Sequence, residues 1–193
     1  MNFQFYLEKL YASEDFQKFV EENKDAYLCS CFFVIDKEKN EDKQHFDYFI
    51  PSTNKMFSFK IESGCERVPV ENIENKIPKK ISDNHNFDFS EIEKIILEKI
   101  DKEKIKTKIQ KILFSLQNSE GTPQAYTQEV RESLRDLDKS SQKISTKGKD
   151  VLLGTVFISA LGMIKIQIDL EDMKIIEFEK KSFLDMFKII KKN

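Results

Sequence analysis

Two cysteines that stand two residues apart are the first side chains in this chain that could do chemistry. Cys29 and Cys31 lie in the apolar stretch AYLCSCFFVID, which favours a strand. On a strand they would share one face about 6.6 Å apart, with parallel Cβ vectors that disfavour a local disulfide. Together with Cys65 or His45 they could ligate a metal, but structural zinc sites normally carry paired CxxC-type spacings. We therefore interpret them as small buried apolar side chains and predict no metal site.

Cys65 is the candidate for a reactive thiol. It lies in the segment SGCER, two residues before Arg67, and a nearby cation lowers the pKa of a thiol. His45 or His85 would have to act as its base, and both histidines stand in polar surroundings that are typical of surface residues. A small enzyme or metal-binding protein that uses Cys29, Cys31 and Cys65 is therefore the alternative interpretation.

Two polar segments resemble known ligand sites without meeting their requirements. The acidic group Asp169, Glu171 and Asp172 could hold a cation, but calcium loops need more oxygen ligands and a glycine, so a solvated turn is expected. The segment STKGK at 145–149 resembles a phosphate loop, but Asp150 stands where that loop needs Ser or Thr. No cofactor is predicted.

Composition excludes several broad classes of function. The net charge is −2, with three arginines and interspersed signs, whereas nucleic-acid binders concentrate basic residues on one face. No stretch approaches the roughly 18 apolar residues of a membrane span, and the N-terminus does not resemble a secretory signal. Three cysteines do not form a disulfide framework. We expect a cytoplasmic protein that binds no nucleic acid.

The first third of the chain predicts helices followed by strands. Two short helices are expected over 3–23, the second capped by Ser13. A central strand over 26–36 precedes a hairpin, 45–50 and 55–62. The rest, 63–89, predicts an irregular connector with an edge strand near residues 67–70.

The middle of the chain predicts helices. Ser90 and Glu93 form a capping-box pattern before an apolar helix face, and isoleucines continue at helical spacing to Leu116 after a phase slip near 101–104. The polar insertion 118–150 predicts a short helix within a surface loop. A pocket for an apolar ligand between the sheet and the helices at 90–117 would leave no trace in the sequence.

The C-terminal part predicts antiparallel strands over 154–178 and a lysine-bearing helix over 182–190. That helix could contact an anionic membrane, but packing on the sheet is favoured. The segment GMIKIQIDLEDMKIIEFEK resembles the strand pair of PepSY-type modules: Ile166, Ile168 and Asp169 match the first strand end, and Ile175-Ile176 match the second. The family's Thr-Gly turn is replaced by Glu171-Asp172. The resemblance implies a small non-catalytic α+β module.

Taken together, the sequence predicts an α+β fold in which mainly antiparallel sheets pack against helices, in two halves of one helical part plus three strands. The halves would span 1–89 and 90–193, or form one compact domain. The predicted function is a non-catalytic soluble module, protein-binding or structural. Exposed sheet edges also make a homodimer reasonable.

Overall fold

The computed structural model describes residues 2–71, 77–119, 148–159 and 162–182. In chain order the elements are α1 (Phe3–Tyr11), α2 (Glu14–Glu22), β1 (Tyr27–Asp36), β2 (Lys43–Ile50), β3 (Lys55–Lys60), β4 (Glu66–Val70), α3 (Phe89–Lys102), β5 (Ile109–Asn118), β6 (Asp150–Ile158), β7 (Gly162–Asp169) and β8 (Lys174–Ser182).

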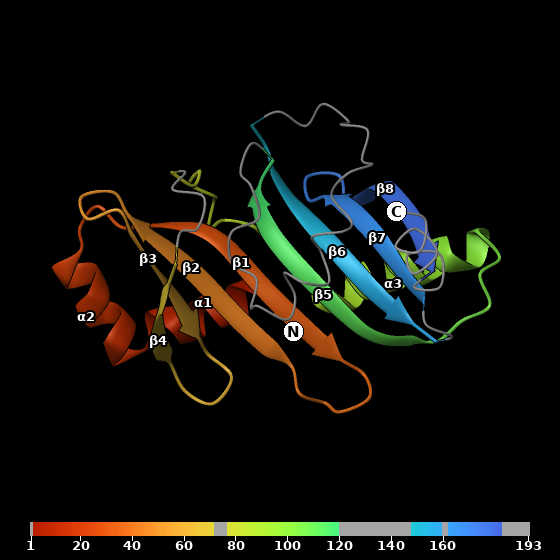
Figure 1. The fold of residues 1–193 in the computed structure, drawn as a ribbon, viewed down its shortest axis with the longest axis horizontal. Coiled ribbons are helices and arrows are strands. Elements are labelled where there is room, and N and C mark those ends of the chain that lie inside the picture. Colours follow the sequence, from red (N-terminus) through yellow and green to blue (C-terminus); the bar gives the residue numbers. More distant parts are fainter. Residues whose placement is uncertain (1, 72–76, 120–147, 160–161, 183–193) are drawn as a thin grey trace, which may run out of the picture.

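One continuous antiparallel sheet dominates the molecule. Its eight strands lie in the order β4-β3-β2-β1-β5-β6-β7-β8 (Figure 1). The first strands of the two halves, β1 and β5, therefore pair with each other at the centre of the sheet. Strands make up 46% of the described residues and helices 22%. The predicted α+β class with three strands in each half is therefore wrong: each half contributes four strands to a single shared sheet.

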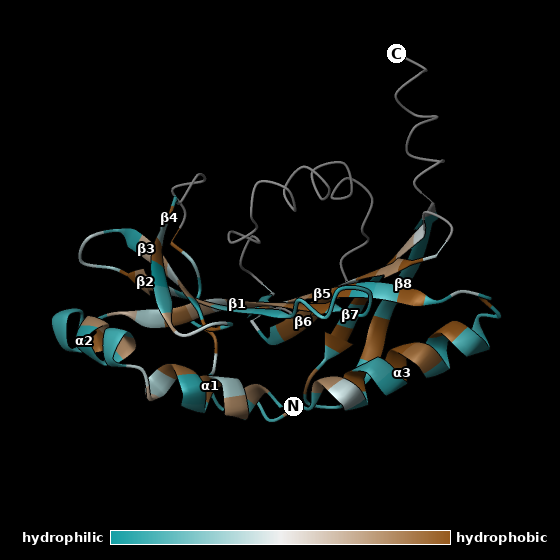
Figure 2. Cartoon of the chain, turned by 90° about the horizontal axis from the view of Figure 1, so that it is seen from below, coloured by the Kyte–Doolittle hydropathy of each residue, from teal (hydrophilic) through white to brown (hydrophobic). Residues whose placement is uncertain are grey.

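Helices α1, α2 and α3 cover the same face of the sheet, as Figure 2 shows. The main core lies between these two layers and takes side chains from both halves of the chain. Phenylalanines fill much of it, and Phe3, Phe33, Phe46, Phe59 and Phe114 are at most 1% exposed. These rings therefore hold the helices to the sheet. We call the opposite side of the sheet the second face.

Most of the predicted N-terminal elements are confirmed. The structure contains the two helices, the central strand, the hairpin and the edge strand, and the Ser13 hydroxyl accepts a hydrogen bond from the Phe16 amide as a helix cap should. The start of α3 differs slightly from the prediction. Asp88, not Ser90, is its N-cap, and its carboxylate accepts from the Ser90 amide at 2.7 Å.

The predicted continuation of the helix from 105 to 116 is wrong. The chain leaves α3 after Lys102 and forms the strand β5, which pairs with both β1 and β6. Ile112, Phe114 and Leu116 alternate into the core, as strand geometry requires. The predicted helix within 118–150 lies outside the described residues, and so does the one over 182–190 except for Ser182, which ends β8. Over the part of the chain that is described, no helix has the length and apolar character needed to cross a membrane.

Candidate functional site

An open cavity of about 160 Å³ lies where the two halves meet on the helix-covered side. We call it the α1–α3 cavity. Its walls come from α1, from the end of β1, from the loop and strand that follow, and from the first two turns of α3. The lining residues are Tyr6, Phe33, Val34, Ile35, Lys37, Asp42, Gln44, Phe89, Ser90 and Glu93.

The cavity exists because α1 and α3 begin side by side and then run apart along the sheet (Figure 2). An isolated bridge pairs Asn2 with Asp88, and the Phe3 amide donates to the Phe87 carbonyl at 3.0 Å. Both bridge residues are also N-caps, with side chains that accept from the first turns of α1 and α3. The sequence thus fixes the two helix starts together and leaves the sheet between them incompletely covered.

Three aromatic rings form the apolar wall of the cavity. Phe33 from the sheet contacts Phe89 of α3 at a ring-centroid distance of 4.8 Å and Tyr6 of α1 at 6.1 Å. Tyr6 and Phe89 are themselves 6.0 Å apart in an edge-to-face arrangement. These separations are typical of favourable aromatic packing, so the wall is a rigid part of the core.

The loop between β1 and β2 supplies the charged rim. Asp36 organises this loop: its carboxylate accepts from the amides of Glu38 and Lys39, and its own amide donates to Asp42 Oδ1 at 2.9 Å. These bonds fix the position of Asp42 at the cavity. Across the rim, Lys37 Nζ lies 2.8 Å from Glu93 Oε2 of α3.

The electrostatics of the cavity are negative at its polar end. The lining contains two carboxylates and one ammonium group, and the ammonium is paired with Glu93. Burial is the largest cause that raises the pKa of Tyr6, and the charges of Asp42 and Asp88 raise it further. The arrangement offers an aromatic wall and acidic groups to a small ligand. The one hydroxyl of a serine among its lining residues, that of Ser90, donates to the Asp88 carboxylate, which is the N-cap of α3.

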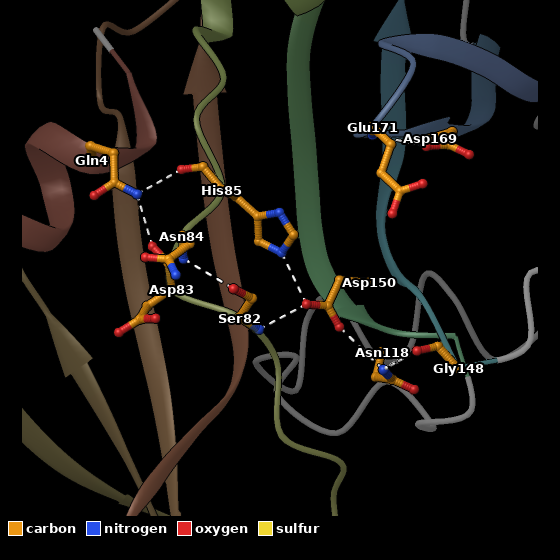
Figure 3. Close-up of polar contacts among 10 residues, drawn as sticks. All are labelled: Gln4, Ser82, Asp83, Asn84, His85, Asn118, Gly148, Asp150, Asp169 and Glu171. Atoms are coloured by element: carbon orange, nitrogen blue, oxygen red, sulfur yellow. Dashed lines mark hydrogen bonds and ion pairs between the residues drawn. The ribbon is translucent and has the colours of Figure 1, made fainter.

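A second polar cluster joins the connector to the start of β6 (Figure 3). His85 Nε2 lies 2.9 Å from Asp150 Oδ2, which also accepts from the Ser82 amide at 2.7 Å. Asn118 Nδ2 donates to Asp150 Oδ1 at 3.1 Å. Burial alone would raise the pKa of Asp150, but these hydrogen bonds outweigh it and lower the pKa. The carboxylate is thus fully engaged in holding two chain segments together.

The acidic group at 169–172 forms a turn, as Figure 3 shows for two of its members. Asp169 Oδ1 accepts from the Glu171 amide at 2.9 Å, which is a turn-stabilising bond. The other carboxylates pair with lysines, Glu171 with Lys149 at 2.5 Å and Asp172 with Lys174 at 3.2 Å. Most of the segment at 145–149 lies outside the described residues.

Cys29 and Cys31 do not share a face, so that prediction is wrong. The register of β1 shifts between Leu28 and Ser30, which places Cys31 in the main core and Cys29 in a small cluster on the second face. Burial strongly raises the pKa of both thiols, which keeps them protonated. The pKa of Cys65 is also raised, chiefly by burial. No group of three metal-ligating side chains occurs within the described ranges.

Asp47, which its sequence context does not mark as a candidate, lies opposite this irregularity on the second face. Ser30 Oγ donates to Asp47 Oδ2 at 2.6 Å, and Cys29 Sγ donates to the Asp47 carbonyl at 3.2 Å. The Asp47 side chain is fully buried, yet its Oδ1 has no hydrogen-bond partner. Burial raises the pKa of Asp47 to about 6, although the hydroxyls of Ser30 and Ser58 act to lower it. The pattern of apolar and polar residues in this hairpin strand does not indicate that the Asp47 carboxylate is buried.

The two histidines both have carboxylate partners, which their positions in the sequence do not indicate. His45 Nε2 lies 2.9 Å from Glu62 Oε1, and its side chain is only 10% exposed. The side chain of His85, beside Asp150, is 18% exposed. Neither histidine lines the cavity, and neither is the surface residue that its polar sequence context predicts.

No family model matches the chain, and a search of curated proteins finds no match. Among solved structures, the chain is similar to the crystal structure of a candidate lipoprotein from Clostridium difficile 630, with 12% sequence identity and a TM-score of 0.46. The similarity covers 87% of this chain and 91% of that one. At this TM-score it carries no argument about function, and the resemblance to PepSY-type modules stays a prediction.

Proposed function

We propose that the chain is a non-catalytic binding module that holds a small ligand, or one side chain of a protein partner, in the α1–α3 cavity. The observation that carries this proposal is the convergence of side chains from four elements on one open cavity. Binding pockets are typically concave and apolar, with a few placed polar groups. The aromatic wall and the charged rim fit that description.

The positions of the reactive side chains support a role without catalysis. A catalytic acid or base has to reach the substrate, and a nucleophile needs a base within hydrogen-bond distance. Here His85 joins Asp150 to hold the connector, and His45 pairs with Glu62. The cysteines are protonated by burial or lie outside the cavity lining.

Blocking the cavity tests the proposal. Ser90 is exposed and lies at the rim, so Ser90→Trp should fill the opening without disturbing the core. Phenol, benzylamine, choline and propionate, added at millimolar concentration, provide neutral, cationic and anionic probes. We expect at least one of them to shift the amide NMR signals of Tyr6, Phe33 and Phe89, and Ser90→Trp to abolish these shifts.

Leu97→Trp is the matched control, because Leu97 is an exposed residue of the same helix that does not line the cavity. This variant should bind the probes as the unaltered protein does. The proposal fails if none of the four probes shifts the cavity residues, or if the shifts persist unchanged in Ser90→Trp.

The cytoplasmic location, the protein partner and the homodimer remain predictions of the sequence. The cysteine-based alternative has its own direct test, which is the metal content of the purified protein. Stoichiometric zinc that Cys31→Ser removes would favour that alternative over the binding module.

A further inference from the structure

The lining of the α1–α3 cavity also indicates which class of ligand it takes. This inference rests on the proposed function and concerns the charge of the bound group. Rings and carboxylates lie on the same cavity wall and rim, and both attract cations: the ring through its quadrupole and the carboxylate through its charge.

The aromatic part consists of Tyr6, Phe33 and Phe89, whose ring centroids lie 4.8–6.1 Å from one another. Recognition of alkylated ammonium groups by proteins typically uses several aromatic rings around one small cavity. The volume of about 160 Å³ is close to that of the engineered cavity of about 150 Å³ that holds benzene. One ammonium group with its alkyl substituents fits such a space.

The charges on the rim favour the same class of ligand. Lys37 is the one cation among the lining residues, and its ammonium group is bound to Glu93. The carboxylate of Asp42 is held at the rim by the Asp36 amide, which is neutral. Asp42 therefore contributes a negative charge that no cation of the lining neutralises.

An anionic ligand would find few donors here, although the cavity includes the start of a helix. The first turn of α3 is already capped, because the Asp88 carboxylate accepts from the Ser90 amide. Glu91 adds a further negative charge to this turn. The helix dipole is thus complemented by the chain itself and is not available to attract an anion.

We propose that the α1–α3 cavity binds an alkylammonium group, placed against the Tyr6, Phe33 and Phe89 rings with Asp42 as its counter-charge. The group belongs either to a free small amine or to a lysine side chain of a protein partner. Both sources present the same chemistry to the cavity.

A matched pair of probes isolates the charge. Choline and 3,3-dimethylbutan-1-ol have nearly the same shape, and they differ in that choline is a cation. We expect choline to bind the full chain about tenfold more tightly than the alcohol, as measured by titration of the cavity NMR signals. Asp42→Asn should weaken choline binding about fivefold and leave the alcohol unchanged.

Asp42→Asn is suited to this test because the asparagine keeps a carbonyl oxygen that can accept from the Asp36 amide, so the loop is preserved. Asp172→Asn is the control, since Asp172 lies in the exposed turn between β7 and β8. Butylammonium and N-acetyl-lysine methylamide then distinguish the two sources. Tighter binding of the lysine derivative indicates a protein partner, and tighter binding of butylammonium indicates a free amine.

The outcomes separate this inference from the proposed function. If the alcohol binds as tightly as choline, or if Asp42→Asn changes nothing, the ammonium class is wrong while the binding module stands. If phenol shifts the cavity signals and choline does not, the ammonium class is again wrong and the binding module again stands. If no probe binds, both proposals fail.

Discussion

Asp47 combines full burial with a carboxylate oxygen that has no hydrogen-bond partner. Isolated buried carboxylates are costly, and they usually respond by taking up a proton. Burial raises the pKa of Asp47 to about 6, so the group is mainly ionised at neutral pH and mainly protonated below pH 6. In the unfolded chain its pKa returns to about 4. The folded state therefore disfavours the ionised form of this side chain.

Removal of this charge should stabilise the protein at neutral pH. Because the folded pKa is raised, the contribution of Asp47 to stability is complete below about pH 4 and is lost as the pH rises to about 6. Asp47→Asn abolishes this loss, and we expect a free energy of unfolding about 1–2 kcal/mol higher at pH 7.5. Urea denaturation of both proteins at pH 4 and pH 7.5 measures the difference.

The exposed residue Asp172 provides the control, and Asp172→Asn should leave the pH dependence as it is. Equal differences at both pH values would show that Asp47 does not titrate in this range. If the Asp47→Asn variant has a lower free energy of unfolding than the unaltered protein at pH 7.5, the asparagine amide has no hydrogen-bond acceptor beside Ser58.

The sequence was least informative about the positions and contacts of single residues. A one-residue irregularity in β1 sends Cys29 and Cys31 to opposite faces, and no periodicity reveals such a shift. The contact of His85 with Asp150 joins residues 65 positions apart in the chain. Each residue looks like an ordinary polar surface residue until the fold brings the two together.

At the scale of elements, helix starts were predictable because caps are local. Ser13 was predicted as the cap of α2, and α3 was placed within two residues of its true start. The strand β5 was missed for a physical reason: Ile109, Ile112 and Leu116 satisfy helical spacing as well as burial in a sheet. Pairing with β1 and β6, which is not visible in the sequence, decides between the two.

The cap of α3 should contribute measurably to stability because it also holds the two helix starts together. Asp88→Ala removes the acceptor for the Ser90 amide and should lower the free energy of unfolding by about 1 kcal/mol. Asp88→Asn keeps a side-chain oxygen and should cost much less. Urea denaturation of the three proteins provides the comparison.

Glu91→Ala serves as the control, because Glu91 is an exposed residue of the same turn. A loss in Asp88→Ala no larger than in Glu91→Ala would show that the cap is replaced by water. An equal loss in Asp88→Asn would indicate that the charge, and not the hydrogen bond, is what matters.

At the scale of the whole molecule, the repeated order of helices followed by strands was visible in the sequence, and the joining of the halves was not. Both halves add their strands to one sheet through seven register pairs between β1 and β5. The same junction carries the cavity, whose lining comes from both halves. A site at a junction of this kind has no local sequence pattern. The sequence therefore gave no information on which residues line the cavity.

The shared sheet implies that the two halves unfold together. Phe114 lies at the junction, fully buried, in register with Phe33 on β1 and Gly154 on β6. Phe114→Ala should therefore lower the free energy of unfolding by about 3–5 kcal/mol for both halves alike. Native-state hydrogen exchange measures this, since amides of β2 and β7 should lose the same amount of protection. Phe5→Ala, at a residue that is 49% exposed, should change neither. Loss of protection in β7 with β2 unaffected would mean that the halves at 1–89 and 90–193 are separate folding units, and the cavity between them would then open whenever one of them unfolds.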